Sequence, residues 1–222
     1  MAIARGKLAL GVAVTAAAVS ALTLSASAAA AQPSGRWGTV VPGCEQGCER
    51  AFSVSLPDNG RLEGLRAKDA DGFPVSYLAY WSGPMLRAST QVRDVRQGWT
   101  YEWVDAAACG PDGEAQRCSV SFGTGAHSGA VASVRVGPRD GIVVTDTVLG
   151  SAPNTGVADL NGDGRPDAAI KESTYEPSYA DGPQYWQTFV QRDGKFTRTG
   201  CTAPSMEAQP VPAAPVSGEC PR

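Results

Sequence analysis

Residues 159–167 read Asp-Leu-Asn-Gly-Asp-Gly-Arg-Pro-Asp, and this stretch is the sharpest chemical signal in the chain. Oxygen-bearing side chains stand at its first, third, fifth and ninth places, and a glycine at the sixth place permits a sharp turn. A Ca²⁺ ion takes roughly 6–8 oxygen ligands at about 2.3–2.6 Å. The spacing therefore predicts a calcium loop, whose ligands are the side chains of Asp159, Asn161, Asp163 and Asp167 and the backbone carbonyl of Arg165.

The stretch resembles the calcium loop of FG-GAP or VCBS repeats, the blades of integrin-like β-propellers, whose pattern D-x-[DN]-x-D-G-x-x-D leads into a β-strand. The residues that match this pattern are Asp159, Asn161, Asp163, Gly164 and Asp167. EF-hand and dockerin loops fit less well, because they require an acid at the twelfth place, which here is Ile170. The resemblance covers about one blade, residues 142–199, and implies an all-β fold with a bound Ca²⁺.

An alternative explains the same residues without a metal. Asp, Asn and Gly favour turns, because the short polar side chains bond to their own backbone. Four oxygen-bearing residues at ligand spacing are more than such a turn needs, which favours the metal. Without an ion, three carboxylates in so short a loop would repel one another. We expect the Ca²⁺ to be structural rather than regulatory.

Residues 1–31 have the three parts of a secretory signal peptide. Arg5 and Lys7 form the charged start, residues 8–24 form the apolar centre, and small residues offer cleavage after Ala28 or Ala31. A membrane anchor is the alternative, but the apolar run is rich in alanine and short of a full span. We therefore expect a secreted, extracellular protein that has no membrane contact after cleavage.

The formal net charge of the chain is −3 at pH 7, and the leader carries two basic residues and no acid, so the mature chain is more acidic still. Proteins that bind nucleic acid carry a basic patch or run. A mildly acidic chain without a Lys/Arg run predicts no nucleic-acid partner.

Six cysteines in an exported chain predict three disulfides. The cysteines lie in pairs that bracket Gly- or Pro-containing segments, and sequential pairing is the simplest of the 15 possibilities: Cys44/Cys48, Cys109/Cys118 and Cys201/Cys220. A zinc site at the first pair is a weaker alternative, because thiolates oxidise outside the cell and no second pair has zinc spacing. A redox role is also weaker, because CxxxC is not the CxxC of thiol oxidoreductases.

Short β-like runs separated by Gly, Pro, Asn and Asp fill the body of the chain. Two pairs of runs predict hairpins, residues 131–136 with 142–149 and residues 185–191 with 195–199. Only Ala106–Ala108 favours a helical turn, with Asp105 as its N-cap. The sequence predicts an all-β fold of short antiparallel strands and hairpins, propeller-blade-like or a sandwich, stapled by disulfides.

The expected parts of the chain are the signal peptide (1–31), an N-terminal disulfide segment (32–49), the all-β domain with the calcium loop (50–202) and a proline-rich tail (203–222). The tail has too many prolines for a helix or a central strand. A Cys201–Cys220 bond would tie it down as a loop. Around Asp69 and Asp71 the first half holds a degenerate copy of the calcium pattern, for which we expect no metal.

Three aromatic residues, Trp99, Tyr101 and Trp103, alternate along residues 98–104 and so share one face of a predicted strand. Aromatic side chains bury a large area, and we expect this face in the core. Stacking on sugar rings is the alternative if the face is exposed.

No catalytic constellation emerges from the sequence. His127 is the one histidine and stands in a Gly-rich loop, and there is no G-x-S-x-G elbow. We expect a secreted, non-catalytic, calcium-binding β domain that serves as a structural or extracellular binding module, with an extracellular protein or polysaccharide as partner. One alternative is a hydrolase inhibitor that presents the loop 109–118, with Arg117 as its contact. The other is a carbohydrate-binding or carbohydrate-active protein.

Overall fold

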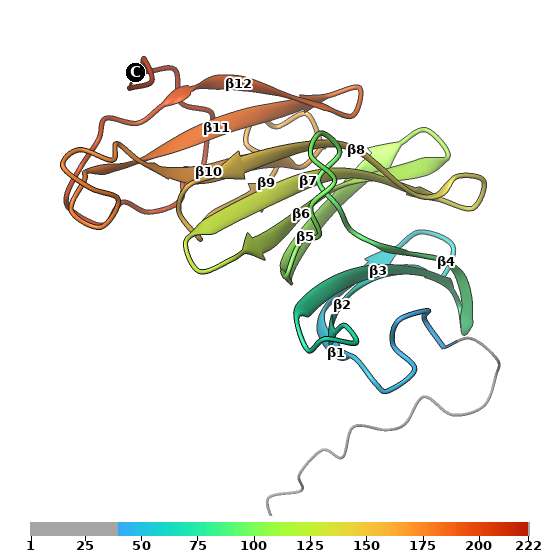
Figure 1. Cartoon of the computed structure of the whole chain (residues 1–222). Coiled ribbons are helices and arrows are strands. Elements are labelled where there is room, and N and C mark those ends of the chain that lie inside the picture. The colour runs from blue at the N-terminus through green and yellow to red at the C-terminus, as the bar shows by residue number, and fades with distance from the viewer. Residues whose placement is uncertain (1–39, 222) are drawn as a thin grey trace, which may run out of the picture. The chain divides into compact units, whose positions relative to one another are not determined.

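Four consecutive strands at a time pair into one sheet, and the described chain is built of three such antiparallel sheets (Figure 1). The structure is a computed structural model that describes residues 40–221. The expected signal peptide, residues 1–31, and the beginning of the N-terminal segment, residues 32–39, lie outside the described residues. The all-β prediction is confirmed, as is its disulfide stapling.

Strand order within each sheet follows the chain, so each sheet is an up-and-down meander. The first sheet contains β1 (Glu49–Leu56), β2 (Gly60–Lys68), β3 (Pro74–Ser82) and β4 (Met85–Gln91). The second contains β5 (Trp103–Asp112), β6 (Ala115–Thr124), β7 (Ser128–Gly137) and β8 (Gly141–Gly150). The third contains β9 (Thr155–Ala158), β10 (Asp167–Ser173), β11 (Gln184–Arg192) and β12 (Lys195–Cys201).

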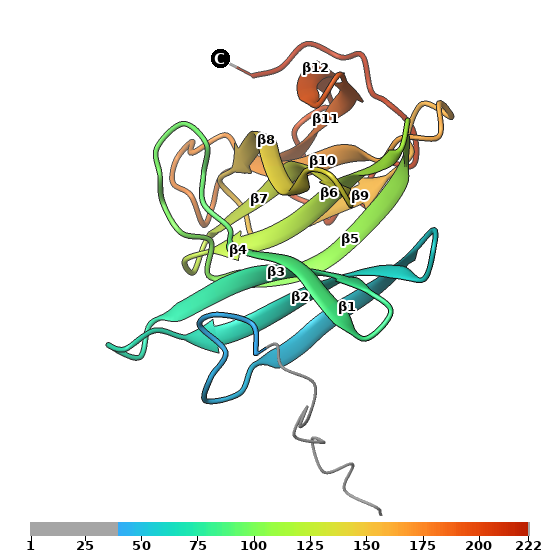
Figure 2. The ribbon, with the colours of Figure 1, turned by 90° about the vertical axis from the view of Figure 1, so that its right-hand side faces the viewer.

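The second sheet is buried on both faces, because side chains alternate along its central strands. Ala132 of β7 joins Leu78 of the first sheet in the larger apolar core. Its neighbour Val131 points the other way and packs with Ile170 of the third sheet. The strands β6 and β7 are therefore buried almost along their whole length. Figure 2 shows their sheet between the other two.

Both predicted hairpins are confirmed, the first as β7–β8 and the second as β11–β12. The strand β8 pairs with β7 in the second sheet, so the third sheet begins later than the expected blade of residues 142–199, at Thr155. The predicted helical turn at Ala106–Ala108 is wrong. These alanines lie in β5 and pair with β6, where sheet pairing outweighs their helical preference.

The sequential disulfide pairing is confirmed, with bonds Cys44–Cys48, Cys109–Cys118 and Cys201–Cys220. The first bond lies in a segment that covers the outer face of the first sheet. Val41 of that segment is buried against Leu65 and Ala79, whose side chains point away from the second sheet.

The proline-rich tail covers the outer face of the third sheet in the same way. The indole Nε1 of Trp186 donates to the carbonyl of Gln209 at 3.2 Å, and the backbone N–H of Val216 donates to Oγ1 of Thr188 at 2.9 Å. Cys201, at the end of β12, is bonded to Cys220 near the chain end. The tail is thus attached to the sheet at several points, although it adds no strand to the sheet.

Candidate functional site

The predicted calcium loop joins the first two strands of the third sheet, β9 and β10. Asp159, Asn161 and Asp163 are exposed on it, and Arg165 is half-buried. Asp167 is the first residue of β10 and is fully buried. The loop therefore runs directly into a strand, as the sequence pattern requires.

Asp159 is the hub of the loop. Its Oδ1 accepts from the backbone N–H groups of Gly162 at 2.8 Å and Asp163 at 3.1 Å, and its Oδ2 accepts from Gly164 at 2.8 Å. Both glycines have left-handed φ values, +76° and +81°, which other residues rarely adopt. The carboxylate of Asp163 in turn accepts the N–H of Arg165 at 2.9 Å. These bonds coil the backbone around its own carboxylates.

Asp167 anchors the other end of the loop from inside the protein. Its oxygens accept the backbone N–H groups of Leu160 at 3.0 Å and Gln191 at 2.7 Å. Burial raises the pKa of this carboxyl, the two N–H bonds oppose the rise, and the charge of Asp163 adds to it. Within residues 40–221 no Lys or Arg forms an ion pair with Asp167. A buried carboxyl without a cationic partner is an environment that a bound cation would stabilise.

The base of the loop rests on the second sheet. The hydroxyl of Ser119 donates to the carbonyl of Pro166 at 2.6 Å and accepts from Nε2 of Gln191 at 3.1 Å. Gly110 on β5 lies so close to the carbonyl oxygen of Gly164 that a Cβ at that position would overlap it. The loop therefore depends on residues that are distant in sequence, and no local pattern marks them.

The residues of the loop fit Ca²⁺ in kind, since all the expected donors are hard oxygens. In the described part of the chain, however, no three His, Cys, Asp or Glu side chains are gathered closely enough to hold a metal ion. The loop carboxylates are held by N–H groups, as described above. A carboxylate offers about four lone-pair sites, so these bonds leave each of them able to accept a further partner.

The degenerate copy of the pattern in the first half occupies a different place in its sheet. Its turn, in which Asp69 accepts the N–H groups of Asp71 and Phe73, joins β2 to β3. The calcium loop instead joins the first and second strands of its sheet. The two turns therefore do not occupy equivalent places in their sheets.

The expected aromatic face is also wrong in part. Tyr101 is fully buried, but Trp99 is 58 % exposed and Trp103 is 39 % exposed. Residues 98–102 lie outside the strands, apart from a single bridge at Thr100, so the two-residue alternation does not hold there. Of the three rings, only that of Tyr101 lies in the core.

Asp94 connects that irregular segment to the second sheet. Its buried carboxylate accepts the hydroxyls of Thr147 at 2.7 Å and Tyr101 at 3.0 Å and the N–H groups of Arg96 and Gln97. Burial would raise the pKa of the Asp94 carboxyl, but these four hydrogen bonds together outweigh it and hold the pKa below its ordinary value. The carboxylate also lines a hollow of about 240 Å³ with Gln97 and Phe189.

Arg117, the proposed contact of an inhibitor, is not available to a protease. Its side chain is only 9 % exposed, and it donates to Asp112 at 2.7 Å and Thr145 at 3.1 Å. The disulfide of this segment joins Cys109 and Cys118, which face each other across β5 and β6. The prediction of Arg117 as a presented side chain is therefore wrong, because the segment is a sheet hairpin rather than a free loop.

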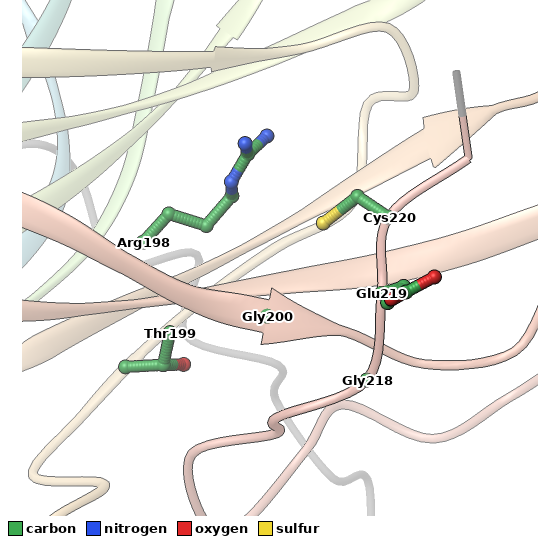
Figure 3. A pocket seen from close by; sticks show the side chains of 6 residues that line it. All are labelled: Arg198, Thr199, Gly200, Gly218, Glu219 and Cys220. Carbon is green, nitrogen blue, oxygen red and sulfur yellow. The ribbon is translucent and has the colours of Figure 1, made fainter.

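An open hollow of about 390 Å³ lies where the tail meets β12 (Figure 3). Arg198 and Glu219 supply its charged groups, and Cys220 of the third disulfide lines it. Gly200 and Gly218 form its backbone wall, where the carbonyl of Gly218 accepts the N–H of Cys201 at 2.9 Å. The hollow thus lies along the contact between the tail and the third sheet.

Comparison of the chain with models of protein families, with curated proteins and with solved structures finds no match in any of the three. The fold defines the class as an all-β protein of three four-stranded antiparallel meanders with three disulfides. Disulfides of this kind persist in oxidising surroundings, which they indicate for this chain. Among residues 40–221 there is no helix of the length and apolarity needed to cross a membrane.

Proposed function

We propose that this protein is a secreted, non-catalytic binding module whose third sheet is stabilised by one Ca²⁺ ion in the loop 159–167. The side chains of Asp159, Asn161, Asp163 and Asp167 and the carbonyl of Arg165 would hold the ion. The ion would neutralise the loop's carboxylates and fix the entry into β10. The function would be extracellular adhesion or scaffolding, as in the FG-GAP repeats that the loop resembles.

One observation carries this proposal: the fully buried carboxylate of Asp167 has only backbone N–H partners in the described chain, and burial, together with the charge of Asp163, raises its pKa. A buried carboxylate that has no cationic partner is costly even when N–H groups bond to it, and binding a cation is one of the ways in which proteins offset that cost. The place of the loop, between the first two strands of an antiparallel four-stranded sheet, supports the same proposal.

Calcium titration of the purified protein by calorimetry, with thermal unfolding in calcium and in chelator, tests the proposal. A bound ion raises the melting temperature because it binds the folded state alone. Asp163→Ala should abolish both the heat of binding and the rise in melting temperature. An unchanged melting curve in chelator would end the calcium proposal.

The matched control for Asp163→Ala is Asp71→Ala. Asp71 is likewise an exposed aspartate, followed by a glycine in a turn, but this turn joins β2 to β3 in the first sheet. It should keep the full response to calcium. A response that falls equally in both variants would mean that calcium acts through general charge and not through the loop.

A further inference from the structure

Three aromatic rings from two different sheets meet on the surface. His127 comes from the turn between β6 and β7, and Tyr175 and Tyr179 come from the connection between β10 and β11. The ring centroids of His127 and Tyr179 lie 5.1 Å apart, and those of Tyr179 and Tyr175 lie 5.7 Å apart. The Tyr179 hydroxyl donates to the His127 carbonyl at 3.2 Å, which joins the two loops.

Tyr175, at one end of this aromatic cluster, is exposed and has a strained backbone. Tyr175 has φ = +59°, a left-handed conformation unusual for a tyrosine, and is 55 % exposed. Such strain persists only where the surroundings enforce it, and it is concentrated at functional positions. A large apolar ring that is placed outward against its own backbone preference is poorly explained by folding stability.

The loop that carries Tyr175 is braced in advance. The Ser173 hydroxyl accepts the N–H of Tyr175 at 3.1 Å and donates to the carbonyl of Tyr179 at 3.2 Å. Farther along, the N–H of Thr174 donates to the carbonyl of Pro183 at 2.9 Å, which closes the loop at its base. A surface ordered before binding loses little entropy when a ligand arrives.

We propose that the aromatic cluster of His127, Tyr175 and Tyr179 binds pyranose rings of an extracellular polysaccharide. The apolar C–H face of a sugar would stack on the exposed ring of Tyr175, because tyrosine combines a flat apolar body with a polar tip. The exposed carboxylate of Glu176, the next residue, would accept sugar hydroxyls beside that ring. The inference deepens the proposed function, since it names the ligand class of the binding module.

The arrangement of the rings favours a sugar over a proline-rich peptide. Peptides of that kind lie in grooves between aromatic side chains. Here neighbouring rings are tilted by 54° and 51° and follow one another in a row, so they do not face each other as the parallel walls of a slot. A row of tilted rings suits ligands that stack one ring at a time.

Retention on insoluble cellulose, chitin and xylan tests the inference with the full folded protein. We expect retention on at least one of them, a loss of at least tenfold in affinity for Tyr175→Ala, and recovery of affinity in Tyr175→Phe, which keeps the stacking face. Equal affinity of Tyr175→Ala and the parent protein, or no retention on any of the three, would overturn it. Binding of a proline-rich peptide at Tyr175 without retention on polysaccharide would also overturn it.

Two controls separate this inference from the calcium proposal. Trp99→Ala removes a comparably exposed aromatic ring from another loop and should leave retention unchanged. Asp163→Ala should lose the calorimetric signal of calcium binding but remain bound to the polysaccharide, because the aromatic cluster lies outside the loop 159–167. Retention without calcium binding would leave the sugar inference standing while the calcium proposal fails, and calcium binding without retention would do the reverse.

Discussion

Gly110 of β5 lies directly against the carbonyl oxygen of Gly164, at the centre of the loop between β9 and β10. The two residues belong to different sheets and are far apart in the chain. Their contact is between backbones, so neither side can yield by turning a side chain. The position of the loop over the second sheet therefore depends on the absence of a single methyl group.

Gly110→Ala should destabilise the protein by about 1–3 kcal/mol, the usual cost of overpacking a filled site, and should weaken the calcium response. Urea denaturation and calcium calorimetry measure the two effects. The control is Gly123→Ala on β6, where an added Cβ would meet Trp103 at an ordinary 3.4 Å. Full stability and full calcium response in Gly110→Ala would contradict the close approach.

Ser119→Ala should cost about 1–3 kcal/mol of unfolding free energy, because it leaves two buried groups without a partner. These groups are the carbonyl of Pro166 and the side-chain amide of Gln191. Chemical denaturation measures the loss. Ser53→Ala, at an exposed position of β1, should stay within about 0.5 kcal/mol of the parent. A neutral Ser119→Ala would show that the loop does not need its support from the second sheet.

The free energy of unfolding should fall in acid as the Asp94 carboxylate takes up a proton. The folded-state pKa of this carboxyl is below its ordinary value, so the stabilisation is fully present above the unfolded-state pKa of about 4. It is lost as the pH falls through the lower folded-state pKa, where a proton displaces the bonds from Thr147 and Tyr101.

Denaturation between pH 6 and pH 2 measures this dependence. Asp94→Asn cannot ionise and offers only one acceptor oxygen, so it should be less stable at pH 6 and should lose stability less steeply in acid. A parallel pH dependence in Asp94→Asn and the parent would assign the acid sensitivity to other carboxyls.

The Cys201→Ser, Cys220→Ser double variant should lose on the order of 3 kcal/mol, because the bond closes a long loop of the unfolded chain. The freed tail should also expose Trp186, whose indole donates to Gln209, so its fluorescence should shift to longer wavelength. The Cys44→Ser, Cys48→Ser variant removes a bond that closes a much shorter loop. It should therefore lose less unfolding free energy and leave the fluorescence of Trp186 unchanged. An unchanged spectrum in the first variant would show that the tail docks without its disulfide.

The features that local chemistry determines could be predicted from the sequence. Alternation and turn residues predicted the all-β class and both hairpins, and the bracketing of Gly- or Pro-containing segments by neighbouring cysteines predicted the disulfide pairing. The prediction was wrong where tertiary pairing decides. The alanines 106–108 form a strand because their backbone pairs with β6. Trp99 is exposed because residues 98–102 lie outside the sheet.

In the candidate site, too, the local part could be predicted from the sequence and the tertiary part could not. The residues 159–167 are contiguous, so their spacing could be interpreted directly. Ser119, Gln191 and Gly110 support the loop from other strands, and a serine, a glutamine or a glycine has no pattern that marks such a role. Likewise, His127 and Tyr179 come together only because two sheets pack against each other.

A stack of sheets whose outer apolar faces are bare offers a surface on which further molecules can pack. Here both outer faces are covered from within the same chain. The segment with Val41 covers that of the first sheet, and the tail with Val216 covers that of the third. As the terminal caps of repeat proteins do, these two segments reduce the apolar surface on which a further layer could pack.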